Sequence, residues 1–412
     1  MIFLYNTAIF LLQGFFKIIS LFHSKAKAFV NGRQNIFQKL EKNFHGNTAP
    51  VIWIHCASLG EFEQGRPVIE ALKKEFPAIK IMLTFFSPSG YEVRKNYSSA
   101  DFIFYLPWDT PSNAKRFVEI TKPVLALFVK YEFWLHYTNE LKKRTIPVVS
   151  ISSIFRKDQL FFKGYGGFYR NILKNFTYFF VQNDESIKLL HSIEIRNCER
   201  AGDTRFDRVF QIVKLAEEIA VVKVFKNNQI VFVIGSSWPE DMEVLSPFIN
   251  EGRIKFIIAP HEISETSLSS TEKLLLVKSI RYSHATDKNV ADCTVLLIDN
   301  VGLLSRLYRY GEFAYIGGAY GKGLHNILEA ACYGVPVFFG NKNYEKFQEA
   351  IDLINRGGAF EVGDYTDLKA KYEMLNIPES FQLACEVTKQ YVEENLGATE
   401  KIMSYCRKVL KS

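Results

Sequence analysis

The chain has 412 residues, a net charge of +7, 48% hydrophobic and 23% charged residues. This length exceeds one ordinary core and suits two domains, and the composition is that of a folded chain. The first half holds the basic excess and the second half is slightly acidic, so we expect the first half to meet an anionic partner. The chain has no dense Lys/Arg run or zinc-finger spacing, which argues against nucleic acid. Six scattered cysteines without a CxxC pair indicate a reducing compartment, the cytoplasm.

Residues 1–22 are almost wholly apolar, with Lys17 as their only charged side chain. The stretch is long enough to span a bilayer. Its polar residues recur on one helical face: Asn6, Gln13, Lys17 and Ser20. That face favours a helix lying in the membrane interface, or one packed along its polar stripe. A signal peptide and a core helix are the alternatives. We predict a membrane anchor with a basic cytoplasmic flank over 1–34, with spanning and surface-lying forms both open.

From residue 51 onward, apolar runs alternate with amphipathic ones. The expected strands of a first domain are 51–57, 79–86, 102–107, 123–129, 146–152 and 178–183. Those of a second are 229–237, 254–260, 294–300, 312–318 and 335–341. Continuous apolar strands separated by helices indicate parallel sheets covered on both faces.

The chain is therefore predicted to be α/β, with two doubly wound, Rossmann-like domains facing a cleft. The predicted bounds are 35–212 and 213–412. A charged helical connector is expected over 209–228, and the final helical segment, 377–412, is a candidate to pack back on the first domain. Ligands are expected beyond the carboxyl ends of the strands.

The segment His55–Phe62 is the first to indicate chemistry, because a strand end runs there into a helix. Gly60 allows close approach of a ligand, and the Glu61 carboxylate could take a proton from an attacking hydroxyl. The spacing Ser58-x-x-Glu61 is equally that of a capping box, and a helix N-terminus favours the ionised, weakly basic carboxylate. Both interpretations stay open on spacing alone.

The segment Gly317–Glu329 reads as a strand, a glycine-rich loop and a helix beginning near Asn326. Such loops offer backbone amides to a phosphate. The spacing is neither that of a Walker A loop nor GxGxxG. Asn326 and Glu329 could also be a simple capping pair, but the glycines, lysine and histidine favour a phosphate or nucleotide site.

Four further segments carry weaker signals. They are 235–240, 259–262 and 299–303, each at a strand end, and the basic, aromatic run 156–176. The last suits a phosphorylated amphiphile or an anionic membrane, and an ordinary amphipathic helix equally well. The dispersed histidines and the lack of HExxH or Asp-x-Asp predict no metal.

Several segments together resemble the 3-deoxy-D-manno-octulosonic acid (Kdo) transferases of lipopolysaccharide synthesis. They are HCASLGEFEQGRPVIEAL, GDTRFD, GSSWPED, IIAPHE, IDNVGLLSRLY and YIGGAYGKGLHNILEAACYGVPVFFG. The resemblance implies a GT-B fold, inverting transfer from CMP-Kdo, and a lipid A precursor of the lipid IVA type as acceptor. It also implies the cytoplasmic face of the inner membrane and no cofactor.

Matching motif by motif, the resemblance assigns Glu61 as general base and Arg205, often lysine in the family, as a group that steadies the transition state. Lys130 occupies a second such position, where many members carry glutamate, and Glu132 is the alternative. Contacts to CMP fall on Pro260, His261, Val301, Gly302, Leu303, Asn326, Ile327, Leu328 and Glu329. His261 replaces a common arginine, so donor binding is expected to be weaker or to depend on pH.

Two other functions fit parts of this pattern. A nucleotide-sugar epimerase on the same scaffold would need neither an acceptor nor an anchor. A non-catalytic, membrane-bound nucleotide-binding module would need neither Glu61 nor Arg205.

Overall fold

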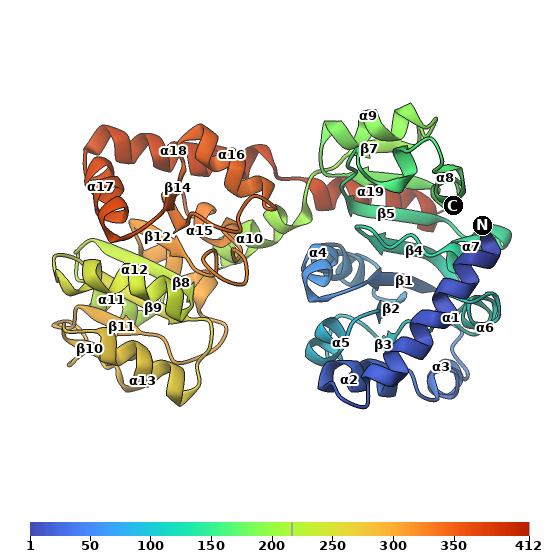
Figure 1. Ribbon diagram of the computed structural model, residues 1–412, viewed down its shortest axis with the longest axis horizontal. Coiled ribbons are helices and arrows are strands. Elements are labelled where there is room, and N and C mark those ends of the chain that lie inside the picture. The colour runs from blue at the N-terminus through green and yellow to red at the C-terminus, as the bar shows by residue number, and fades with distance from the viewer. Residues whose placement is uncertain (216, 412) are drawn as a thin grey trace. The chain divides into compact units, whose positions relative to one another are not determined.

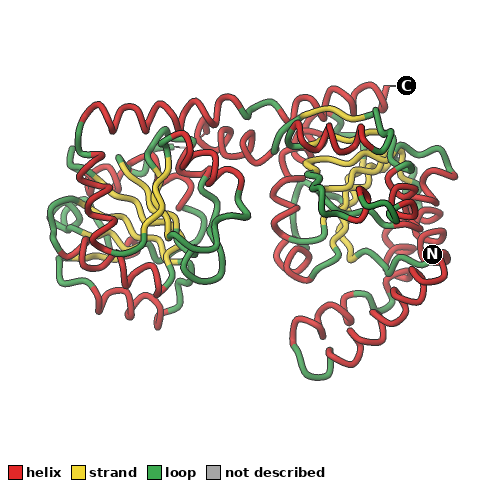
Figure 2. The backbone as a smooth tube through the Cα atoms, turned by 45° about the horizontal axis from the view of Figure 1, so that its top comes forward, coloured by secondary structure: helices red, strands yellow, loops and turns green. Residues whose placement is uncertain are grey.

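The computed structural model describes residues 1–215 and 217–411, so Ala216 in the predicted connector and the terminal Ser412 lie outside the described residues. The chain forms two compact units. One is Met1–Asp207 with Leu396–Ser412, and the other is Arg208–Asn395. Each has a sheet between layers of helices (Figures 1 and 2). The predicted cleft between two domains stays a prediction.

The N-terminal unit is built on a parallel seven-stranded sheet in the order β3-β2-β1-β4-β5-β6-β7. Its strands are β1 (Val51–Cys56), β2 (Lys80–Phe85), β3 (Phe102–Tyr105), β4 (Pro123–Val129), β5 (Val148–Ser153), β6 (Tyr178–Val181) and β7 (Cys198–Arg200). Its helices are α1 (Ile2–Ile19), α2 (Ser24–Gly32), α3 (Ile36–Phe44), α4 (Leu59–Glu75), α5 (Pro88–Arg94), α6 (Pro111–Thr121), α7 (Leu135–Lys143), α8 (Gly167–Leu173), α9 (Asp184–Ser192) and α19 (Ala398–Lys411), with a 3₁₀ turn η1 (Leu160–Phe162).

Strand β1 shows why this sheet is buried on both faces. All six of its residues are buried, and alternate side chains enter different cores because successive strand residues point to opposite faces. Trp53 joins the cluster beneath α3, α6 and α7, whereas Ile54 joins the cluster beneath α4. Helix α19 completes the second cluster with Ile402 and Met403.

Helix α1 packs with its polar side inward. The Tyr5 hydroxyl donates to Asp109 Oδ2 at 2.6 Å, and Asn6 Oδ1 lies 2.6 Å from His136 Nε2 on α7. Farther along, the ring of Phe16 stacks on Phe29 of α2. Only 6% of the helix is buried, and most of its large apolar side chains point to solvent. Figure 1 shows α1 lying along the outside of the unit.

The C-terminal unit has its own parallel seven-stranded sheet, in the order β10-β11-β9-β8-β12-β13-β14. Its strands are β8 (Val231–Ser237), β9 (Lys255–Pro260), β10 (Ser279–Arg281), β11 (Val295–Leu297), β12 (Phe313–Ile316), β13 (Val337–Gly340) and β14 (Ala359–Val362). Its helices are α11 (Ala220–Lys226), α12 (Pro239–Asn250), α13 (Glu265–Leu274), α14 (Leu304–Leu307), α15 (Leu328–Ala331), α16 (Gln348–Arg356), α17 (Tyr365–Leu375) and α18 (Pro378–Glu394), with 3₁₀ turns η2 (Tyr282–His284) and η3 (Tyr308–Tyr310). Helix α10 (Thr204–Leu215) begins in the N-terminal unit and ends in this one.

At two positions at the carboxyl edge of this second sheet, the surrounding atoms leave no room for any side chain larger than that of glycine. A Cβ on Gly235 would lie 1.9 Å from the Tyr308 hydroxyl, and one on Gly317 would lie 2.3 Å from the Ser236 carbonyl. Gly318 has a φ of 96°, which side chains rarely adopt. The predicted pair of doubly wound α/β domains is confirmed by the two sheets.

Candidate functional site

The candidate residues of the N-terminal unit leave the sheet where its strand order reverses. Strand β1 has β2 on one side and β4 on the other, so the connections after β1 and β4 depart in opposite directions. Ligands of doubly wound sheets bind at such a point, beyond the carboxyl ends of the strands. Glu61 follows β1, and Lys130 and Glu132 follow β4.

Glu61 occupies the third position of α4 and closes a capping box. Its Oε2 accepts from the Ser58 amide at 2.9 Å and from the Ser58 hydroxyl at 3.2 Å. The capping interpretation is therefore structurally present. The pKa of Glu61 is nevertheless raised, first by burial and then by the charge of Glu132, while His55 and Lys130 oppose the rise. The Glu61 carboxylate therefore caps α4 and is also more basic than usual, because burial raises its pKa by more than the hydrogen bond at the helix N-terminus lowers it.

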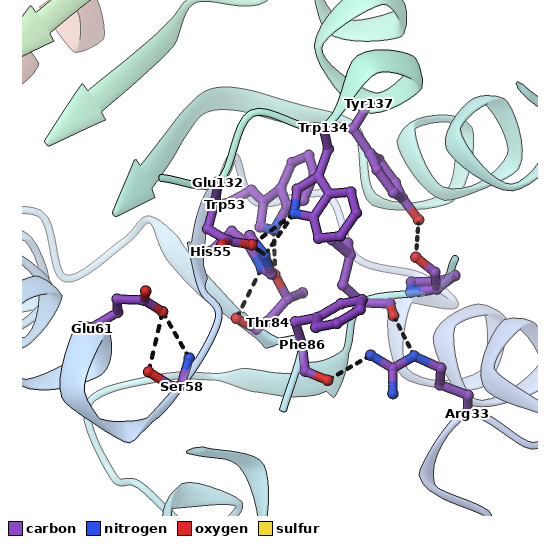
Figure 3. A network of polar contacts seen from close by, with 12 residues as sticks. Arg33, Trp53, His55, Ser58, Glu61, Thr84, Phe86, Glu132, Trp134 and Tyr137 are labelled. Atoms are coloured by element: carbon purple, nitrogen blue, oxygen red, sulfur yellow. Dashed lines mark hydrogen bonds and ion pairs between the residues drawn. The ribbon is translucent and has the colours of Figure 1, made fainter. Parts of the chain in front are cut away.

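Glu132 is held in place by two donors from different elements. Trp134 Nε1 lies 2.8 Å from its Oε2, and His55 Nε2 lies 3.0 Å from the same oxygen. Behind the imidazole, His55 Nδ1 lies 2.8 Å from Thr84 Oγ1, which also accepts from Trp53 Nε1 at 2.8 Å. Figure 3 shows this chain of contacts beside Glu61 and Ser58.

Both ring nitrogens of His55 have polar partners. Nδ1 lies 2.8 Å from Thr84 Oγ1 and 3.2 Å from the Thr84 carbonyl oxygen, and Nε2 lies 3.0 Å from Glu132 Oε2 and 3.2 Å from Trp134 Nε1. These contacts connect Trp53 to Glu132 and hold the Glu132 carboxylate close enough to raise the pKa of Glu61.

Arg205 is oriented by a buried carboxylate. Asp203, 6% exposed, accepts from the Arg205 amide, and Arg205 Nη2 lies 2.8 Å from its Oδ2. Gln64 of α4 donates to the same oxygen at 2.9 Å. Burial raises the pKa of Asp203, but Arg205 and, more weakly, Lys130 outweigh it and lower the pKa. Lys130 acts on both Asp203 and Glu61, so the three predicted residues of this unit belong to one electrostatic cluster.

The basic segment 156–176 reaches the same region at one end. Arg156 Nη1 lies 3.1 Å from the Tyr131 hydroxyl, and Tyr131 follows Lys130. The segment is not one amphipathic helix but the η1 turn followed by α8, because Arg170 bonds the carbonyls of Phe161 and Lys163 and folds the chain back.

In the C-terminal unit, rings gather at the corresponding edge, after β8, β9 and β12. The Trp238 ring stacks on His261 with centroids 4.3 Å apart, and His261 lies 4.6 Å from His325. Trp238 Nε1 donates to His325 Nε2 at 3.1 Å, and Lys322 lies over the indole. Burial, and then His261, lower the pKa of His325 to about 4, and burial lowers that of His261. Both imidazoles are therefore neutral near pH 7.

Several backbone amides of the glycine-rich loop already donate hydrogen bonds within the protein. Those of Gly317, Gly321, Gly323 and His325 donate to backbone carbonyls, and that of Gly318 donates to Asp241 Oδ2 at 2.9 Å. These five amides already have acceptors. A phosphate would therefore have to be bound by other backbone amides of the segment Gly317–Glu329.

The helix predicted to begin near Asn326 is shorter than expected. It is the single turn α15, and the Asn326 side chain accepts from the Leu328 amide at 3.2 Å and contacts Glu329 at 3.3 Å. Asn326 thus bonds the first amide of α15 from one position before the N-cap, which is Ile327 and has no side-chain cap. One turn of helix supplies little dipole, so any phosphate here depends mainly on individual amides.

The remaining candidates lie at the same edge of the C-terminal sheet. Pro260 ends β9, and Gly302, with a φ of 94°, turns the chain between the exposed Val301 and Leu303. Ile327 immediately precedes α15. Sequence reasoning missed His55, Thr84 and Trp238 as partners, although a histidine inside the buried run VIWIHC was a usable signal.

Comparison with known proteins shows similarity to one family of enzymes. Residues 32–208 match the family model described as 3-Deoxy-D-manno-octulosonic-acid transferase (kdotransferase). The 3-deoxy-D-manno-octulosonic acid transferase of Aquifex aeolicus (strain VF5) is 26% identical over 346 residues, covering 82% of this chain and 89% of that protein. The one of Rickettsia bellii (strain RML369-C) is 26% identical over 358 residues, covering 85% and 84%. The chain is thus similar to Kdo transferases over most of its length, and its N-terminal unit matches their family model.

The fold of this chain is also found in other enzymes. The crystal structure of UDP-GlcNAc 2-epimerase from Neisseria meningitidis bound to UDP-GlcNAc has a TM-score of 0.59 at 16% identity, covering 87% of this chain and 100% of that one. The fold is thus GT-B, as predicted. Because an epimerase shares it, the fold alone does not separate transfer from epimerisation.

Proposed function

We propose that this protein transfers Kdo from CMP-Kdo to a phosphorylated lipid A precursor of the lipid IVA type, with inversion at the anomeric carbon. The observation that carries the proposal is the half-buried Glu61 carboxylate at the switch point of a domain that matches the Kdo transferase model, with its pKa raised. A general base is most effective when its pKa lies near the working pH.

In the proposed reaction, Glu61 accepts the proton of a primary hydroxyl on the acceptor. The hydroxyl oxygen attacks the anomeric carbon of Kdo, and the bond from that carbon to the phosphate oxygen breaks, so CMP leaves with the electron pair. Arg205, oriented by Asp203, and Lys130 supply positive charge as negative charge grows on the phosphate. Glu132 has the supporting role of raising the basicity of Glu61.

The donor is proposed to bind at the ring cluster and glycine-rich loop of the C-terminal unit. Its predicted CMP contacts are Pro260, His261, Val301–Leu303 and Asn326–Glu329. Their clustering at one sheet edge supports this proposal, as do the flat rings and amides there, which suit a base, a ribose and a single phosphate.

Helix α1 is proposed to anchor the protein to the cytoplasmic face of the inner membrane. Its polar side chains Tyr5 and Asn6 form hydrogen bonds to the N-terminal unit, and its apolar side faces outward. A surface helix of a soluble protein has the opposite arrangement, with its apolar side against the core. Contacts near both ends hold it along the domain, which favours a helix lying in the interface.

The test is to incubate the full chain with CMP-Kdo and a lipid A precursor and to analyse the lipid by mass spectrometry. We expect a mass increase of Kdo units, and CMP release only when acceptor is present. Conversion of a nucleotide sugar without acceptor would support an epimerase instead. Nucleotide binding without any turnover would support a non-catalytic module.

A further inference from the structure

An open groove lies on the N-terminal unit between α1, α2 and the start of α5. Its volume is about 840 Å³, within the range of sites that hold small ligands. Its walls are largely hydrocarbon, supplied by Phe16 and Ile19 of α1, Phe29 of α2, Phe86 after β2 and Val93 of α5.

The groove begins beside the strand that leads to Glu61. Strands β1 and β2 are paired, with Cys56 opposite Phe85, and the Ser87 amide donates to the Ala57 carbonyl at 2.7 Å. Ser87 lines the groove, and Ala57 directly precedes Ser58, the cap of α4. One sheet edge therefore presents the groove and the candidate base from neighbouring strands.

Phe86 joins the groove to the charged cluster. Its ring packs on Trp134 with centroids 4.9 Å apart, and Trp134 donates to Glu132. Its carbonyl accepts from the Arg33 guanidinium, which also bonds the Leu106 carbonyl and fixes this wall (Figure 3). A ligand would thus pass from apolar to charged surroundings across a single side chain.

The apolar surface continues from the groove onto the exposed face of α1. Phe16 and Ile19 face the groove, whereas Phe15 and Ile18 of α1 are 56% and 64% exposed, and Phe22, just after the helix, is 86% exposed. A surface this apolar is typical of contact with lipid or a partner. It gives a hydrocarbon chain a continuous path between the membrane and the edge that carries Glu61.

We infer that the groove binds one acyl chain of the lipid acceptor and thereby brings the sugar hydroxyl of that lipid to Glu61. The inference rests on the proposed function. The lipid acceptor is favoured over a bulk phospholipid because it alone needs its polar end at Glu61. Each buried CH₂ changes affinity about fourfold, so a few would determine recognition of the acceptor.

The first test uses Ala28→Trp, which fills the groove from α2, and Val93→Asp, which puts a charge on a wall residue that is 58% exposed. Ala78→Trp, on an exposed loop of the same unit, is the control. We expect both groove variants to raise the KM for acylated acceptor about tenfold, with turnover of a deacylated acceptor and the KM for CMP-Kdo unchanged. An unchanged preference for acylated acceptor in Val93→Asp would overturn the inference.

The second test needs no turnover. Photoactivatable tetradecanoic acid in phosphatidylethanolamine–phosphatidylglycerol vesicles is crosslinked to the full chain, and labelled peptides are mapped. We expect label on 16–29 and 86–93, less label in Val93→Asp, and competition by lipid A precursor but not by added phosphatidylglycerol. Equal competition by both lipids would overturn the inference in favour of bulk lipid. Protection of the groove from labelling that rises with protein concentration would overturn it in favour of a second copy of the chain. Labelling that competes as expected without any Kdo transfer would reject the proposed function and leave the groove as a lipid site.

Discussion

In the N-terminal unit, the switch point between β1 and β4 gathers ionisable side chains that act on one another. In the C-terminal unit, the switch point between β8 and β12 gathers aromatic rings, neutral imidazoles and backbone amides. The carboxylate of Asp241 at that second point is already bonded by the amides of Trp238 and Gly318 and the Tyr315 hydroxyl. The same topology therefore carries interacting ionisable side chains in one unit, and mainly rings and backbone amides in the other.

The largest effect should follow Glu61→Gln. We expect kcat to fall by about 10²- to 10⁴-fold, because the amide accepts no proton, while CMP affinity is retained. Steady-state CMP release and calorimetric titration of CMP measure the two quantities. Near-normal turnover with intact CMP binding would contradict the proposed role of Glu61 as the group that accepts the proton.

Arg205→Ala should lower kcat by about 10²-fold, and Arg205→Lys should restore part of it, because the loss is mainly one of positive charge. Arg200→Ala, at an exposed ion pair with Asp184, is the matched control. Thermal unfolding must accompany the kinetics, since Asp203 loses its partner. Equal loss in the alanine and lysine variants at equal stability would contradict a role of charge.

Opposite shifts of the pH–rate profile should follow changes at Glu132 and Lys130. Glu132→Gln removes a charge that raises the pKa of Glu61, so the acid limb should move to lower pH. Lys130→Met removes a charge that lowers this pKa, so the limb should move to higher pH. We expect shifts below about one unit. Glu41→Gln, at an exposed pair with Arg116, should leave the profile in place.

The smallest effect concerns His325 in the C-terminal unit. Its folded pKa of about 4 lies below the value near 6.5 of an unfolded histidine, so the unfolded chain binds the extra proton between these values. Stability should therefore fall as the pH drops from 6.5 toward 4, by about 1 kcal/mol for a partly exposed ring. His325→Asn should flatten this fall in urea unfolding and match the wild-type dependence above pH 7. An unchanged slope in the variant would contradict a neutral imidazole.

The predicted parts of the fold are those encoded locally. Buried strands such as VIWIHC and the capping box at Ser58 and Glu61 depend on neighbouring residues, so sequence patterns suffice. The chain from Trp53 through Thr84 and His55 to Glu132 joins residues 29 to 77 positions apart. No local pattern encodes such pairing. The helix predicted to begin near Asn326 begins at Leu328 and lasts one turn, a length that the local sequence pattern does not indicate.

The return of α19 to the first unit has a consequence for synthesis. The core beneath α4 includes Ile402, Met403 and Cys406, and Arg407 pairs with Glu75. These residues follow the second unit in the sequence, so the N-terminal unit closes its core only after the second unit has been made. Nascent chains that stop before Ala398 should therefore expose this core to proteases and chaperones.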